Sequence, residues 1–185
     1  MTPLHGDAVR ILTAWQPPDT IQKLLRNRYL RHLATHDDGL WRTRLPEHVT
    51  ASALVVSKDR ERVLLHLHGK VGRWLQFGGH CEQEDSTLAG AAYREVLEES
   101  GLAVDLDDVP VQLSRHHVHC GGTTAYHLDV QYVAVAPDKG VPVRSSESQA
   151  LRWYAADALP EDADEAVRSL VARSRERLRT RTPIR

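Results

Sequence analysis

The sequence predicts an α/β fold in which helices cover a mixed β-sheet, preceded by a helical extension at the N-terminus. Three observations predict it: residues 1–47 carry helical patterns, strand-like runs begin at His48, and later helical segments interleave with strands without strict alternation. We therefore expect an N-terminal helical extension over residues 1–47 and one domain over residues 48–180. A chain of 185 residues is long enough for one such core and too short for two ordinary domains.

The extension is predicted to hold two helices. Residues 7–16 form the first, which ends at Pro17-Pro18 because proline cannot continue a helix. Asp19 is placed to cap the second helix. Apolar side chains follow at roughly helical spacing, at Ile21, Leu24, Leu25, Leu30 and Leu33.

Strand patterns dominate the middle of the chain. Residues 50–57 and 62–68 flank the turn-like segment KDRE and predict a hairpin. A second pair of strands is predicted around Gly121-Gly122, a turn-favouring pair. In its second strand, apolar Leu128, Val130 and Tyr132 alternate with polar His127, Asp129 and Gln131. That alternation predicts a strand with one buried face and one polar face.

The C-terminal third completes the predicted domain. Residues 136–148 have the proline, glycine and serine content of a loop, and residues 150–156 read as one more short strand. A last helix is expected from Asp162, with acidic residues at its start and arginines at its end. This order complements the helix dipole.

Composition excludes several classes of protein. The formal net charge of −1 gives no overall basic field, which argues against nucleic acid and membrane surfaces as partners. No window approaches the ~18 apolar residues of a membrane span. The N-terminus lacks the pattern of a secretory signal, so we expect a cytoplasmic protein whose two cysteines, Cys81 and Cys120, are free thiols.

Residues 78–102, GGHCEQEDSTLAGAAYREVLEESGL, hold the strongest chemical signal. From Leu88 the segment predicts an amphipathic helix, capped at its start by Asp85 or Ser86 and closed by Gly101. At about 100° per residue, Glu99 falls within the apolar arc of this helix. Its neighbours Glu95 and Glu98 lie on the flank of that arc, so all three carboxylates border the core.

Three carboxylates beside a core need positive charge. Repulsion and partial burial would otherwise raise their pKa values, and the single guanidinium of Arg94 cannot neutralise three acids. A hard divalent cation can, and Mg²⁺ and Mn²⁺ bind carboxylate oxygens while keeping positions open for water and phosphate. The residues therefore predict a magnesium or manganese site. A solvated acidic helix face is the alternative.

The same residues resemble the Nudix box, whose pattern is G-x5-E-x7-R-E-U-x-E-E-x-G-U with U apolar. The second half matches through Arg94, Glu95, Val96, Glu98, Glu99, Gly101 and Leu102, and the lead-in matches through Gly72, Trp74, Gly78, Gly79 and Glu82. The box is one residue too long between Gly79 and Arg94, where Asp85 stands in for the first glutamate of the pattern. The resemblance implies a Nudix α/β/α sandwich with a mixed sheet.

The resemblance also implies roles for the residues. Glu95, Glu98 and Glu99 would bind Mg²⁺ or Mn²⁺ with a backbone oxygen near Gly79, and Arg94 would orient Glu95. A further acid often comes from a loop ahead of a late strand in this family. Glu147 fits that position as general base or metal ligand, although a solvated loop glutamate is an equal alternative.

Four residues are candidates for substrate contact: Trp74, His80, Asp129 and Gln131. For Trp74, packing in the core is the favoured alternative. Several histidines cluster around the strands, namely His66, His68, His116, His117, His119 and His127. Their spacing matches no known zinc pattern, so polar faces or substrate contacts are favoured over a transition-metal site.

The predicted function is metal-dependent hydrolysis of a diphosphate linkage in a small-molecule nucleoside diphosphate derivative. One alternative is a Nudix-fold module that senses a nucleotide without cleaving it. Another is an isomerase on the same fold, which would need a cysteine motif that neither Cys81 nor Cys120 resembles. The substrate is not determined by the sequence, and a homodimer is left open.

Overall fold

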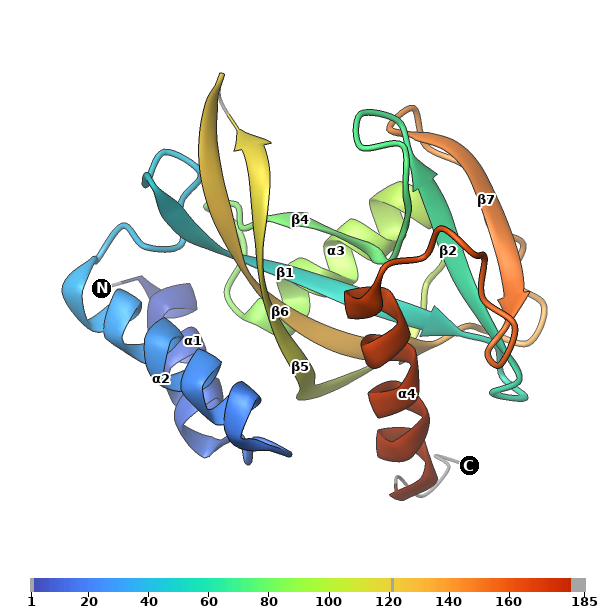
Figure 1. The fold of residues 1–185 in the computed structure, drawn as a ribbon, viewed down its shortest axis with the longest axis horizontal. Coiled ribbons are helices and arrows are strands. Elements are labelled where there is room, and N and C mark those ends of the chain that lie inside the picture. The colour runs from blue at the N-terminus through green and yellow to red at the C-terminus, as the bar shows by residue number, and fades with distance from the viewer. Residues whose placement is uncertain (1, 121, 181–185) are drawn as a thin grey trace.

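The computed structural model describes residues 2–120 and 122–180 (Figure 1). Its helices are α1 (Pro3–Ala14), α2 (Thr20–Thr35), α3 (Leu88–Ser100) and α4 (Glu165–Thr180). Its strands are β1 (Glu47–Val56), β2 (Arg62–His68), β3 (Trp74–Leu75), β4 (Phe77–His80), β5 (Asp105–Cys120), β6 (Thr123–Val135) and β7 (Ser148–Ala155). Among these residues, no helix is long and apolar enough to cross a membrane.

The strands form one mixed, curled sheet. Its main path runs β3-β2-β1-β6-β5, with β4 also paired to β1 and β7 to β2. Strands β1 and β6 are parallel over their whole paired length, and the other pairs are antiparallel. The prediction of an α/β fold with a mixed sheet is confirmed.

Helices cover both faces of the sheet. Helix α3 packs on one face together with α1 and α2, whose buried side chains join the same core cluster. Helix α4 packs on the opposite face over a second cluster drawn from β1, β2 and β6. In Figure 1, α3 lies behind the sheet and α4 in front of it. The chain is therefore layered as helix, sheet and helix.

The two faces of β6 differ from the prediction. Leu128, Val130 and Tyr132 are buried in the larger core as expected. The polar side chains of Asp129 and Gln131 are also buried, so the expectation of a half-exposed strand is wrong. The reason is the curl of the sheet and the cover of α4, from which Ser169 donates a hydrogen bond to Gln112, the partner of Gln131.

The N-terminal helices dock on the sheet. Gln22 of α2 makes two hydrogen bonds with the backbone of Leu113 in β5, at 3.0 Å as donor and 2.7 Å as acceptor. Asp19 caps α2 as predicted, by accepting from the N–H of Gln22. Helix α1 begins at Pro3 under a Thr2 cap, which is earlier than predicted, and ends at Ala14. The boundaries proposed for the extension and the domain remain predictions.

The ends of α3 are set by two residues. Thr87 is the N-cap, so the prediction that Asp85 or Ser86 caps the helix is wrong. Gly101 closes it in the left-handed conformation, with φ 68°, as predicted. Asp7 of α1 accepts a hydrogen bond of 2.9 Å from the N–H of Leu88, so the extension satisfies a donor in the first turn of α3.

Candidate active site

Helix α3 presents its three glutamates at different depths. Glu99 is 5% exposed and accepts a hydrogen bond of 2.9 Å from the N–H of Gly78 in β4. The side chain of Glu95 is 14% exposed, and that of Glu98 is 55% exposed. The positions of the three residues around the helix axis therefore place Glu99 in the core, Glu95 at its edge and Glu98 in solvent, which is the order expected from the sequence.

Arg94 ties the glutamates to the strand that precedes the helix. Its guanidinium donates to Glu95 at 3.0 Å, to Glu98 at 3.1 Å and to the carbonyl oxygen of His80 at 2.9 Å. Two further hydrogen bonds, at 3.2 and 3.0 Å, join it to both carboxylate oxygens of Asp85. Asp85 therefore holds the guanidinium of Arg94 in place. The segment between Gly79 and Arg94, which is one residue longer than the Nudix pattern, includes the loop that ends at the N-cap Thr87.

The ionised forms of Glu95 and Glu99 are disfavoured in this cluster. Burial raises the pKa of Glu95 to about 7 against the charge and hydrogen bond of Arg94, and the charges of Glu98 and Glu147 add to the increase. Burial likewise raises the pKa of Glu99 to about 8, against the hydrogen bond from Gly78. Without a cation, these two carboxyl groups keep their protons to a higher pH than ordinary glutamates do and are at least partly protonated near neutral pH.

The glycine pair permits the close approach of β4. A Cβ on Gly78, whose φ is 158°, would lie 2.2 Å from the Cβ of Ser52 in β1. A Cβ on Gly79 would lie 2.7 Å from a carboxylate oxygen of Glu95. Any side chain at either position would therefore push β4 away from β1 or displace the Glu95 carboxylate.

Glu147 lies in the loop directly before β7, where an additional acid was expected. Its side chain is exposed, and its charge contributes to the raised pKa values of both Glu95 and Glu99. Its own backbone oxygen accepts from the N–H of Gly69 at 2.8 Å, which anchors the loop to the end of β2. The loop thus brings Glu147 toward the α3 glutamates.

His66, one of the clustered histidines noted in the sequence, lies beside Glu99. Its Nδ1 is 2.7 Å from the hydroxyl oxygen of Ser148 and 3.8 Å from a carboxylate oxygen of Glu99. The 3.8 Å distance to Glu99 would suit an ion pair if the imidazole were protonated, but burial lowers the pKa of His66 to about 4. A neutral imidazole at this place adds no compensating charge to the acids.

The candidates for substrate contact have different surroundings. Trp74 packs edge-on against Tyr154 with a centroid separation of 5.1 Å and joins the cluster under α4. Asp129 accepts hydrogen bonds from Thr50, Ser52 and Gln131, at 3.1, 2.7 and 2.8 Å.

Gln131 also accepts from Gln112 at 2.9 Å, so both polar residues of β6 are engaged within the protein. His80 lies at the end of β4, within ring contact of His48 and His127. Cys81, the next residue, is a buried free thiol whose pKa burial raises to about 12, which makes it a poor nucleophile.

Comparison with known proteins agrees with this arrangement. A family model described as the NUDIX domain matches residues 46–173. The oxidized purine nucleoside triphosphate hydrolase of Mus musculus is 34% identical over 110 residues, which cover 58% of this chain and 67% of that protein. A MutT-like protein of Streptomyces ambofaciens is 30% identical over 116 residues, 63% of this chain and 70% of that one.

Solved structures share the fold. A NUDIX-family hydrolase from Clostridium perfringens superposes with a TM-score of 0.55 at 26% identity, covering 69% of this chain and 94% of that chain. A C. elegans Ap4A hydrolase gives a TM-score of 0.58 at 17% identity, covering 71% and 97% respectively, and is similar in fold alone. Because the family model matches most of the sequence and includes the whole glutamate cluster, the chain belongs to the Nudix hydrolase family.

Proposed function

We propose that this Nudix hydrolase cleaves a diphosphate linkage in a small nucleoside diphosphate derivative, with Mg²⁺ or Mn²⁺ held by Glu95, Glu98 and Glu99. The observation that carries the proposal is the burial of Glu95 and Glu99, with pKa values raised to about 7 and 8, on one helix turn beside a single guanidinium. Relatives whose names specify a nucleoside triphosphate or Ap4A substrate support the nucleotide class.

The donor set fits a hard divalent cation. The three side chains offer only oxygen atoms, which Mg²⁺ and Mn²⁺ prefer, and they hold more negative charge than Arg94 can offset. Gly79 lies directly against the Glu95 carboxylate, since a Cβ there would be 2.7 Å from one of its oxygens, so a backbone oxygen at Gly79 is the candidate for a further donor. When bound, such a cation would acidify water and neutralise charge on phosphoryl oxygens.

The chain's own residues supply positioning and proton transfer. Arg94 fixes the Glu95 carboxylate, and the Gly78 N–H fixes that of Glu99. As the oxygen of water attacks phosphorus, the bridging P–O bond breaks and its electron pair leaves with the departing phosphate. Glu147 takes the proton of the attacking water as general base, because it is an exposed acid whose field reaches the cluster.

Substrate recognition falls to residues beside the glycine pair and on the polar side of β6. We assign Trp74, His80, Asp129 and Gln131 as candidates for contact with the base or sugar. Asp129 and Gln131 would have to exchange hydrogen bonds within the protein to do so. A cytoplasmic location and a homodimer also remain predictions.

The test is phosphate release from nucleoside triphosphates, nucleotide sugars, dinucleotides and related diphosphates, with Mg²⁺, with Mn²⁺ and with chelator. Glu98→Gln and Glu99→Gln are expected to fold and to lose at least about 100-fold in turnover, in line with the loss of one strong charge-stabilising group. Glu176→Gln, an exposed glutamate on α4, is the matched control.

Two outcomes would change the proposal. Wild-type rates in both glutamine variants would remove the metal assignment. Tight nucleotide binding without turnover across the whole panel would favour a sensor module on the same fold.

A further inference from the structure

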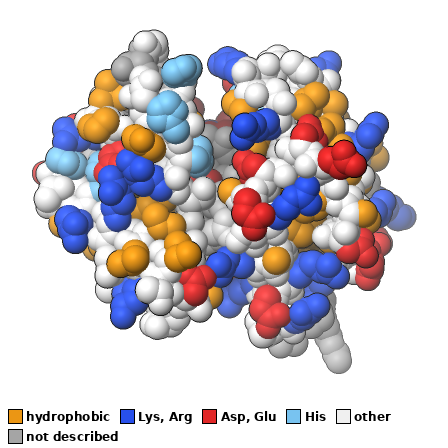
Figure 2. Space-filling model, in the orientation of Figure 1, with side chains coloured by type: hydrophobic (Ala, Val, Ile, Leu, Met, Phe, Trp, Pro, Cys, Tyr) orange, Lys and Arg blue, Asp and Glu red, His pale blue; other side chains and the backbone are white. Residues whose placement is uncertain are grey.

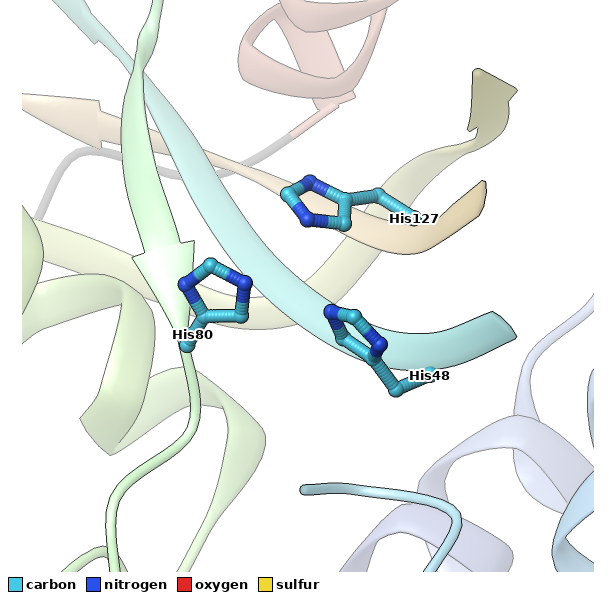
Figure 3. A group of neighbouring side chains, drawn as sticks. All are labelled: His48, His80 and His127. Atoms are coloured by element: carbon cyan, nitrogen blue, oxygen red, sulfur yellow. The ribbon is translucent and has the colours of Figure 1, made fainter. Parts of the chain in front are cut away.

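Three histidines from three strands meet at one end of the sheet (Figure 3). His48 is the second residue of β1 and lies opposite His127 in the parallel pairing with β6. His80 ends β4, whose register places it beside Thr50, two residues along β1. Because side chains two residues apart share a face of a strand, all three imidazoles project from the same side of the sheet.

The three rings are close enough to share an ion. One ring nitrogen of each lies within 4.8 Å of the corresponding nitrogens of the other two. The ring centroids are 5.0 Å apart for His48 and His127, 5.1 Å for His48 and His80, and 4.9 Å for His80 and His127. A tetrahedral zinc with Zn–N bonds of about 2.0–2.1 Å needs ligand nitrogens roughly 3.3 Å apart, so small rotations of the rings would suffice.

A hydrogen bond to the backbone orients the His48 ring so that its other nitrogen is available to a metal ion. Its Nδ1 is 3.0 Å from the carbonyl oxygen of Arg44, which can only accept, so Nδ1 carries the proton and Nε2 carries a lone pair. This is the arrangement in which a backbone carbonyl orients a metal-binding histidine. The Nε2 atom is buried and has no hydrogen-bond partner among the described residues.

His127 shows the same signature. Its Nε2 is also buried without a partner in the described part of the chain. Two buried ring nitrogens left unsatisfied at one place are costly and call for a ligand, since buried polar atoms are nearly always paired. Burial lowers the pKa of His127 to about 2 and also lowers that of His48, so both rings are in the neutral form that binds metals.

The positive charge of Arg42 disfavours the binding of a cation by these histidines. Its field contributes to the lowered pKa values of His48, His80 and His127. The side chain is exposed on the loop before β1. In Figure 2, histidines gather over the β5–β6 hairpin beside a hollow in this face.

We propose that His48, His80 and His127 form a transition-metal site that binds Zn²⁺ and is separate from the magnesium or manganese site of α3. Three neutral imidazoles suit Zn²⁺, whereas Mg²⁺ and Mn²⁺ prefer oxygen donors. The three ligands leave a fourth position for water. Because the backbone oxygen of His80 accepts from Arg94, a zinc bound here would clamp β1, β4 and β6 next to the glutamates.

Zinc binding is measured by competition with a chromophoric chelator in the Glu98→Gln/Glu99→Gln variant, which lacks two of the carboxylates. One saturable Zn²⁺ per chain is expected. Co²⁺ should give the intense visible bands of a tetrahedral site. Adding His80→Asn, a partly exposed position, should weaken Zn²⁺ binding by at least about 10-fold, as should His48→Asn.

His119→Asn is the matched control, since His119 is an exposed histidine on the hairpin that also carries His127. It should leave the stoichiometry and the Co²⁺ spectrum unchanged. Absence of saturable Zn²⁺ binding in the parent, which is the Glu98→Gln/Glu99→Gln variant, would overturn the proposal. Equal binding by the parent and the folded His80→Asn and His48→Asn variants would do so as well. Neither readout depends on turnover, so this test can fail while the proposed hydrolysis stands.

Discussion

The glutamate cluster and the histidine cluster are built in opposite ways. Glu95, Glu98 and Glu99 lie within five consecutive positions on one helix, so α-helical geometry alone brings them together. His48, His80 and His127 come from three strands and meet only through the pairing of β1 with β4 and β6. The first cluster can be read from a short motif, whereas the second exists only in the folded chain.

Burial also shifts the pKa values of the two clusters in opposite directions. The buried glutamates hold protons above their usual range, with pKa values of about 7 and 8 for Glu95 and Glu99. Burial has the reverse effect on histidine, because it disfavours the charged imidazolium and lowers the pKa of His127 to about 2. One cluster is short of positive charge, and the other is neutral with unsatisfied nitrogens.

Outside the proposed metal ligands themselves, the largest effect is expected at Arg94, which contacts both Glu95 and Glu98. Arg94→Lys removes the paired hydrogen bonds to Asp85 and cannot replace the contacts to Glu95, Glu98 and His80 at once. We expect turnover to fall by about 10–100-fold, the usual cost of losing a residue that orients metal ligands. Steady-state kinetics with Mg²⁺ measures it.

A double-mutant cycle with Asp85→Asn separates orientation from ligation. If Asp85 acts by holding Arg94, the two losses will not add. Additive losses would instead assign Asp85 an independent role at the metal. Arg62→Lys, an exposed arginine at the start of β2, is the matched control.

A smaller effect is expected in the pH dependence of stability, where the two clusters have opposite signs. In chelator, the folded state binds more protons than the unfolded state because Glu95 and Glu99 titrate at about 7 and 8 instead of 4.5. The free energy of unfolding therefore falls as the pH rises from 4.5 to about 8. The lowered pKa of His127 makes stability rise with pH up to 6.5, and contributes nothing above it.

Thermal unfolding in chelator between pH 6.5 and 8.5 measures the contribution of the glutamates to stability separately from that of His127. We expect the wild type to lose on the order of 1–3 kcal/mol across this range, given about 1.4 kcal/mol per pKa unit. Glu99→Gln should flatten the slope, whereas His127→Asn should keep it. A wild-type slope of zero or of opposite sign would contradict the assignment of raised pKa values to the folded state.

The smallest effect concerns the link between the N-terminal extension and α3. Asp7→Asn weakens the hydrogen bond that α1 offers to the N–H of Leu88, and it also removes a partner of Arg10. Loss of such a terminal contact costs about 1 kcal/mol, so the melting temperature should fall by a few degrees. Turnover below the transition should be retained, and Asp37→Asn, exposed after α2, is the control. A variant that is fully stable would show that α1 does not support α3.

Sequence reasoning reached most of the elements because each is specified by its own residues. The apolar spacing of α2 and the Asp19 cap, the β1–β2 hairpin around KDRE, and the Gly101 end of α3 are local signals that the structure confirms. It missed the Thr87 cap because Asp85, an equally good capping residue, is drawn into a bidentate contact with Arg94. It wrongly predicted an exposed polar face on β6, because the cover of α4 that buries this face is a property of the packed chain.

The sequence by itself determined the glutamate cluster, since three acids on one helix face keep their relation whatever surrounds the helix. Tertiary structure alone decided the depth to which Glu99 is buried, the commitment of Asp85 to Arg94, and the meeting of three histidines. His48 and His127 are 79 positions apart, and only the parallel pairing of β1 with β6 makes them neighbours. No local pattern records such a pairing, because its register is set by long-range hydrogen bonds and by the packing of both faces of the sheet.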